Sequence, residues 1–171
     1  VWIESGSQLK TIAGGLDQGK IRDGSQIYVK THYYGAFLGC SSLKSFSVPS
    51  SVVEIGKSAF KDCSSLSELS FDACSELKTI DESAFEDCSF MRRIDMRNCS
   101  KLTSIGANAL HGGYDVKTYL FQIGANIPPV LGNDALNVSY EYSVLKVPAG
   151  SESAYKKASY WSYFSSITAI D

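Results

Sequence analysis

The chain has 171 residues, 44% of them hydrophobic and 20% charged, and its formal net charge is −2. This length suits one domain, and the composition is that of a globular protein, which excludes the disordered and fibrous classes. The near balance of charge gives no electrostatic reason to expect nucleic acid or an anionic membrane as a partner, and no apolar run approaches the roughly 18 residues of a membrane span.

The N-terminal region is the least regular part of the sequence. The first residues, Val1-Trp2-Ile3-Glu4, include no Met and no export signal, so we expect a mature chain or an excised piece. The segment Leu9-Lys10-Thr11-Ile12 copies Leu77-Lys78-Thr79-Ile80, whereas the following residues 13–34 are irregular and glycine-rich. Within them, Ile27-Tyr28-Val29 is predicted to form a strand. We predict that residues 1–34 are a degenerate N-terminal repeat or cap.

An internal repeat occupies residues 35–122. An Ala-Phe pair at residues 36–37 recurs at 59–60 and at 84–85, and Ala109-Leu110 is a degenerate copy of it. The alanines at 36, 59, 84 and 109 are separated by 23, 25 and 25 residues. A fixed period in this range is typical of a solenoid, in which each repeat forms one coil and neighbouring coils share a core.

Apolar residues lie at fixed offsets inside each repeat, in the pattern apolar-x-x-apolar-x-apolar. The sets are Leu43, Phe46, Val48; Leu66, Leu69, Phe71; Met91, Ile94, Met96; and Val116, Tyr119, Phe121. The last two members of each set alternate as in a strand, which predicts short strands at 46–48, 69–71 and 94–96. Stacked about 4.8 Å apart, these strands would form one parallel sheet over a continuous core.

The Ala-Phe segments are too short for full helices. We predict a helical turn on the side opposite the sheet, with Phe37, Phe60 and Phe85 stacked inward. Further apolar pairs follow at Val52/Ile55, Leu77/Ile80 and Leu102/Ile105. The predicted fold class is therefore an α/β repeat solenoid, with short parallel strands on one face and short helical turns or irregular segments on the other.

Residues 123–171 depart from the repeat and are predicted to cap it. Val144–Pro148 is predicted to be a strand that proline ends, and Ser151 is predicted to cap a helix over residues 152–158. Aromatic residues beyond it would cover the last coil, and Ile167-Thr168-Ala169-Ile170 would close the chain. No linker or second domain is visible, so we expect residues 1–171 to form a single solenoid domain.

The repeat resembles the BspA-type branch of leucine-rich repeats. The residues that carry the resemblance are Val48 to Leu66, VPSSVVEIGKSAFKDCSSL, and the unit Leu66-x-x-Leu69-x-Phe71-x-x-Cys74-x-x-Leu77. The tail from Leu145 to Trp161 resembles the closing segment of secreted Bacteroidetes members. The resemblance implies a leucine-rich-repeat arc in a bacterial protein that is secreted or on the cell surface, including as a lipid-anchored outer-membrane protein. It also implies adhesion to host proteins or other cells, and the family offers no shared catalytic residue.

The five cysteines fall into two rows. Cys40, Cys63 and Cys88 share one offset in the repeat, and Cys74 and Cys99 share another. We favour free thiols that act as small buried hydrophobic residues. A disulfide between adjacent coils remains open, because stacked strands bring Cα atoms about 5 Å apart. A catalytic thiol is the least supported reading, and neither row has the spacing of metal ligands.

The sequence offers no other constellation for catalysis or cofactor binding. The two histidines, His32 and His111, have no spacing relation to a cysteine that suggests Cys-His catalysis. No GxSxG, HExxH, GxGxxG or P-loop pattern occurs. We therefore expect a non-enzymatic protein without a metal or cofactor.

The best candidate for a binding surface is the concave face of the predicted sheet. Positions that flank the inward ones point outward, and they are Ser45, Ser47, Pro49, Glu68, Ser70, Asp72, Arg93, Asp95, Arg97, Thr118, Leu120 and Gln122. The candidate binding residues among them are Glu68, Ser70, Asp72, Arg93, Asp95, Arg97, Thr118 and Gln122. A simpler reading is a solvated face on which these charges satisfy one another.

These observations leave two functional hypotheses. The first is a monomeric binding module that recognises a protein or glycan on a host or neighbouring cell. The second is a structural spacer or cap of a larger surface protein, with no ligand of its own. Nucleic acid is not expected as a partner of either.

Overall fold

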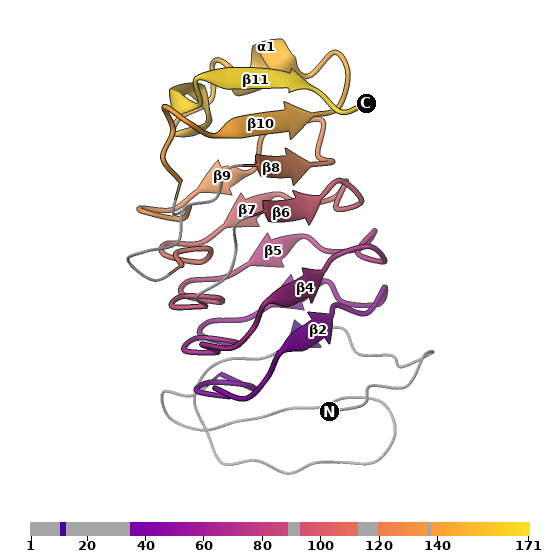
Figure 1. Ribbon diagram of the computed structural model, residues 1–171. Coiled ribbons are helices and arrows are strands. Elements are labelled where there is room, and N and C mark those ends of the chain that lie inside the picture. Colours follow the sequence, from indigo (N-terminus) through magenta and orange to yellow (C-terminus); the bar gives the residue numbers. More distant parts are fainter. Residues whose placement is uncertain (1–10, 13–34, 89–92, 113–119, 137) are drawn as a thin grey trace.

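The structure is a computed structural model that describes residues 11–12, 35–88, 93–112, 120–136 and 138–171. The chain winds into coils that stack along one axis, with the C-terminal segment at one end (Figure 1). This confirms the predicted repeat solenoid. The expected strand at 27–29, the interior positions Met91, Val116 and Tyr119, and the face residue Thr118 lie outside the described residues.

One row of parallel strands follows the axis, and we call its outward side the sheet face. The row consists of β2 (Ser45–Ser47), β4 (Glu68–Ser70), β6 (Arg93–Met96), β8 (Leu120–Ile123), β10 (Val144–Val147) and β11 (Ser166–Ala169). The predicted strands at 46–48, 69–71, 94–96 and 144–148 are confirmed to within one residue. The hydrogen-bonded ladder is divided, because β2 pairs with β4 while β6, β8, β10 and β11 form a separate sheet of four strands.

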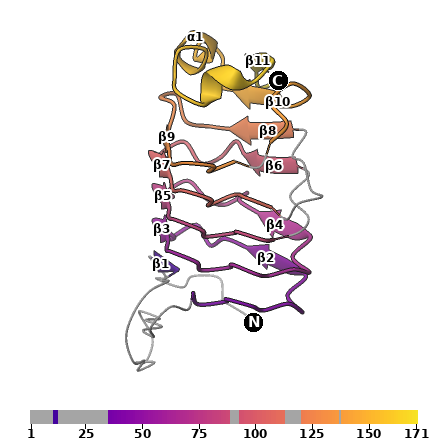
Figure 2. The same ribbon diagram turned by 90° about the vertical axis from the view of Figure 1, so that its left-hand side faces the viewer.

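A second row of strands, which the sequence analysis missed, lies on another side of the coils (Figure 2). It is a five-stranded parallel sheet of β1 (Thr11–Ile12), β3 (Glu54–Ile55), β5 (Thr79–Ile80), β7 (Ser104–Ile105) and β9 (Val130–Leu131). The expectation of one sheet is therefore wrong. Strands of two residues contain one inward side chain each, so they are too short to show the alternation that identifies a strand.

We call the side with the Ala-Phe pairs the turn face. It consists of turns, so the predicted helical turn is not confirmed. Its segments are residues 35–40, 56–63, 81–88, 106–112 and 132–136. Residues with left-handed backbones occur at both ends of a segment, as at Ser58 (φ 55°) and Asp62 (φ 61°). Such residues interrupt a right-handed helix. The segments bond to the next coil instead, for example from the Phe60 amide to the Ala84 carbonyl at 2.7 Å.

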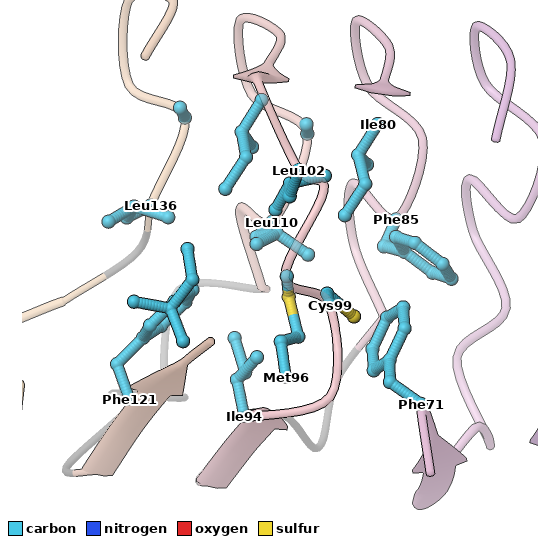
Figure 3. Close-up of a cluster of buried hydrophobic side chains, with 14 of the residues drawn as sticks. Phe71, Ile80, Phe85, Ile94, Met96, Cys99, Leu102, Leu110, Phe121 and Leu136 are labelled. Carbon is cyan, nitrogen blue, oxygen red and sulfur yellow. The ribbon is translucent and has the colours of Figure 1, made fainter. Parts of the chain in front are cut away.

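The core runs through all coils as columns of like side chains. The rings of Phe37 and Phe60 stack with centroids 4.8 Å apart, and those of Phe60 and Phe85 with centroids 5.0 Å apart, which confirms the predicted inward stack. Figure 3 shows how Phe71, Met96 and other side chains from the strands point toward residues of the turn face. Glycine is required where coils approach each other closely, because a Cβ at Gly124 would lie 1.9 Å from the Arg97 carbonyl oxygen.

The C-terminal segment covers the last coil with a short helix, α1 (Glu152–Tyr155), and a 3-10 helix, η1 (Trp161–Tyr163) (Figure 1). The expected helix over 152–158 is too long, because the amides of residues 157 and 158 bond to carbonyls only three residues back. Ser151 is the N-cap residue as expected, but its side chain makes no capping hydrogen bond. The predicted aromatic cover is confirmed, with Tyr155 and Trp161 fully buried.

Candidate binding face

Most of the predicted outward positions of the sheet face are exposed or half-buried. Ser45, Ser47, Glu68, Arg93 and Arg97 are exposed, and Ser70, Asp95 and Leu120 are half-buried. Asp72 and Pro49, beyond the ends of their strands, are exposed and half-buried respectively. The face is therefore polar and accessible at its centre, where the two arginines lie.

Gln122 differs from this pattern, because it is buried although it points to the same side as Asp95. The parallel register places Gln122 directly beside Asp95 on one neighbour and Lys146 on the other. Its exposed fraction is only 4%, since the side chains of Arg93 and Arg97 lie over it. Gln122 is thus a support beneath the face rather than part of its accessible surface.

The two arginines converge on Asp95 and Gln122. Arg97 forks onto the Asp95 carboxylate, with Nε 3.0 Å from Oδ1 and Nη2 2.8 Å from Oδ2. Its Nη2 also donates to Gln122 Oε1 at 2.6 Å. Arg93 reaches the same two acceptors more loosely through Nη2, at 3.2 Å from Asp95 and 3.4 Å from Gln122. Two guanidinium groups therefore share one carboxylate and one amide.

This pairing changes the acidity of the groups. Hydrogen bonds from Arg97 lower the pKa of Asp95, although partial burial opposes the shift. The carboxylate in turn raises the pKa of Arg97, to which Asp72 and Asp171 contribute at longer range. Asp95 is therefore ionised under all ordinary conditions, and one positive charge of the cluster is not neutralised by it.

The remaining predicted residues lie beside this cluster without joining it. The Ser70 hydroxyl donates to the Asp72 carboxylate at 2.8 Å, and Asn98 Nδ2 donates to the Asp72 carbonyl oxygen at 2.9 Å. Glu68 forms no ion pair with either arginine in the described chain. Thr118 lies outside the described residues.

Sequence reasoning missed two charged residues of the face. Lys146 lies beside Gln122 in the register of β8 and β10, and its ammonium group pairs with the Asp171 carboxylate. Continuing the spacing of the repeat from Gln122 by one more coil would have found Lys146. Asp171 could not be found in this way, because it follows the final strand and no repeat position corresponds to it.

The cysteine columns offer no reactive group on this face. All five cysteines are free, and Cys63, Cys74, Cys88 and Cys99 are buried as expected, whereas Cys40 is exposed. The Cys88 thiol lies 3.1 Å from the Phe60 carbonyl oxygen of the preceding coil. Contact with Cys63 and burial raise the pKa of Cys88, so this thiol stays protonated and is a poor nucleophile.

Within the described ranges, no cluster of three or more His, Cys, Asp or Glu residues is arranged to hold a metal ion. Neither helix in the part of the chain described by the structure is long and apolar enough to cross a membrane.

Comparison with known proteins identifies the repeat. A family model described as "BspA type Leucine rich repeat region" matches residues 27–128 in six copies, which is more than half of the chain. No curated protein and no solved structure matches the chain significantly. The family match confirms the resemblance seen in the sequence.

Proposed function

Because the chain belongs to the BspA-type leucine-rich repeat family, we propose that it is a non-enzymatic module that binds a protein or glycan on a host or neighbouring cell. Domains of leucine-rich repeats are typically protein-interaction scaffolds rather than enzymes. The proposed contact surface is the sheet face, centred on Arg93 and Arg97 and including Glu68, Ser70, Asp72 and Thr118. The proposed location is the cell surface or the secreted fraction, with a lipid anchor as one means of attachment.

The observation that carries this proposal is the way in which the arginines are held. Both guanidinium groups are tied to Asp95 and Gln122, so their positions are fixed before any ligand arrives. Nevertheless their side chains are 58% and 43% exposed. Fixing donor groups in advance reduces the entropy that ligand binding would otherwise cost.

The arginines also keep unused hydrogen-bonding capacity. Arg93 uses only Nη2, so its Nε and Nη1 make no bond to a described residue, and Arg97 likewise keeps Nη1. A guanidinium group has five N–H donors in one plane, suited to a carboxylate. Acidic groups on the partner are therefore the ligand chemistry that this cluster fits best, and arginine is enriched among residues that dominate binding energy.

A second candidate function is a structural spacer, and the ion pairs between coils favour it. Lys57 pairs with Glu82, Lys61 with Glu86 and Lys101 with Glu76, each pair joining two successive coils. A surface whose charges satisfy one another suits a rod that separates other domains. Exposed pairs of this kind stabilise a protein by at most about 1 kcal/mol each.

Capture of ligands by the immobilised chain separates the two candidates. Extracellular matrix proteins, mucus glycoproteins and neighbouring cells would be passed over the folded protein in a series of salt concentrations. A binding module is expected to retain at least one of them at low salt and to release it as salt rises, because exposed charges are screened. No retention at any salt concentration would contradict the binding function and favour the spacer.

A further inference from the structure

A pocket of about 330 Å³ opens where the last segment of the turn face meets the C-terminal segment. Its polar and aromatic lining consists of His111, Asp134, Tyr140, Tyr160 and Tyr163, and small aliphatic residues complete it. The sheet face contributes no residue to this lining. The pocket is therefore separate from the surface on which the proposed function rests.

Three tyrosines line the pocket, and the ring of Tyr163 is nearly perpendicular to the rings of Tyr140 and Tyr160. The ring of Tyr163 is 5.6 Å from that of Tyr140 at an interplanar angle of 85°, and 5.9 Å from that of Tyr160 at 82°. Phe164 supports Tyr140 from another side, with centroids 5.2 Å apart. The pocket is therefore lined by tyrosine rings in nearly perpendicular orientations.

The backbone is strained at this pocket. Tyr160 has a φ of 65°, which is uncommon for a bulky residue. Its hydroxyl donates to Asn133 Oδ1 at 3.2 Å, which ties the strained residue to the last turn segment. Strain of this kind persists only where surrounding contacts impose it, and it is concentrated at binding sites.

One acidic residue of the turn face, Asp134, lines the pocket. Asp134, with a φ of 51°, occupies the left-handed position that Ser58, Ser83 and Asn108 hold in earlier coils, so a carboxylate replaces a neutral side chain. Burial and then the charge of Asp134 raise the pKa of Tyr140. No Lys or Arg lines the pocket, and Asp134 has no ion-pair partner among the described residues.

We propose that this pocket binds an organic cation, that is, an ammonium or guanidinium group on an alkyl stem. Cations are attracted to the faces of aromatic rings, most strongly when rings surround them and exclude water. Asp134 supplies the opposite charge at the edge of the three tyrosines. The cation can be a free quaternary ammonium compound or the side chain of a Lys or Arg on a protein partner, and both present the same chemistry.

Calorimetric or NMR titration with small probes tests this assignment. The cationic probes are choline, butylamine and butylguanidinium, and the neutral control is 3,3-dimethylbutan-1-ol, which has the shape of choline without its charge. We expect each cation to bind about tenfold or more tightly than the neutral alcohol. Equal binding of the alcohol, tighter binding of a methyl glycoside, or no binding of any probe would overturn the proposal.

Two variants locate the site. Asp134→Asn keeps the shape of the side chain and tolerates a left-handed backbone, and it is expected to weaken cation binding about tenfold. Asp62→Asn is the matched control, because Asp62 has a similar φ of 61° three coils earlier, and it is expected to leave binding unchanged. Equal losses in the two variants would contradict the assignment.

The aromatic part of the site and the source of the cation need separate measurements. Tyr163 is 60% exposed, so Tyr163→Leu should fold, and it is expected to weaken binding severalfold whereas Tyr163→Phe retains it. Peptides with a central Lys or Arg that bind more tightly than choline would identify a protein side chain as the source, and the reverse order would identify a free compound. Because the pocket variants are read out with choline, butylamine and butylguanidinium, that outcome does not depend on whether the sheet face binds a partner.

Discussion

The repeat coils and the C-terminal segment differ in whether their aromatic contacts recur along the chain. In the coils, Phe60 stacks nearly parallel on its copies, with interplanar angles of 13° and 8°. In the C-terminal segment, Tyr155 and Trp161 meet at 80°, and Trp161 meets Phe121 at 67°. The coils therefore repeat one contact, whereas the C-terminal segment uses contacts that occur once.

Hydrogen bonds also recur in the repeat coils and occur once in the C-terminal segment. In the coils, backbone amides bond to the next coil at regular intervals. In the C-terminal segment, side chains bond to backbone groups of the last coil: the Tyr155 hydroxyl donates to Ala125 and the Trp161 indole donates to Pro129, both at 2.7 Å. Each repeat coil is hydrogen-bonded by the similar coil that follows it. No further repeat follows the last coil, so individual side chains of the C-terminal segment bond to its backbone instead.

The largest expected effect tests the column of phenylalanines. Phe60 is fully buried between two copies of itself, so Phe60→Ala leaves a cavity that the neighbouring coils cannot fill. We expect a loss of about 3–5 kcal/mol in the free energy of unfolding, measured with urea. The half-buried Phe37 is the control, and its replacement by alanine should cost less. Similar stability of Phe60→Ala and the wild type would contradict the stacked column.

A smaller effect is expected in the C-terminal segment. Tyr155→Phe keeps the buried ring and removes the hydroxyl, which leaves the Ala125 carbonyl without this donor. Loss of a buried hydrogen bond should lower the free energy of unfolding by about 1–3 kcal/mol. Tyr142→Phe serves as the control, because Tyr142 is 73% exposed and should change stability by less than about 0.5 kcal/mol. Equal effects at the two positions would show that the bond to Ala125 does not hold the segment in place.

The sheet face is expected to contribute less to stability, and in a way that depends on pH. Hydrogen bonds from Arg97 lower the pKa of Asp95 in the folded chain, so its contribution is present above the unfolded value of about 3.9. This contribution is lost as pH falls through the folded pKa. Asp95→Asn should therefore cost at most about 1 kcal/mol near neutral pH, and the difference should shrink near pH 2. Urea unfolding at both pH values measures it, and a constant difference would refute the pairing.

Thiol reactivity tests the coils without altering their sequence. Among the five free cysteines, Cys40 is exposed and the other four are buried. We expect one thiol to react rapidly with a thiol reagent in the native protein and all five to react after denaturation without reductant. A denatured count of three or one would show disulfides between coils and contradict the free columns.

The features of this fold that could be predicted from the sequence are those that recur at fixed offsets in the repeat. The phenylalanine stack and the strands of the sheet face follow from apolar residues at fixed offsets, and both were predicted. The strands at Glu54–Ile55 and its copies were missed because two residues show no period. The left-handed turns at Ser58 and Asp62 were missed because such backbones have no fixed sequence signal when glycine is absent.

The sequence predicted where the candidate binding residues lie on the sheet, but it did not predict the contacts between them. The spacing placed Arg93, Asp95 and Arg97 on one outward strand; the structure has Arg93 and Asp95 in β6, and Arg97 directly follows the end of that strand. Burial of Gln122 could not be predicted, because it results from side chains of the preceding coil lying over it. The division into residues 1–34, 35–122 and 123–171 stays a prediction.

The most direct test of the binding face compares two double variants for attachment to host matrix or cells. Arg93→Ala with Arg97→Ala removes two cations from the sheet face, and Lys57→Ala with Lys61→Ala removes two from the turn face, together with their pairs to Glu82 and Glu86. Both variants should remain folded. We predict that attachment is lost only in the arginine variant, and unaltered attachment by that variant, folded as judged by circular dichroism, would contradict a binding site on the sheet face.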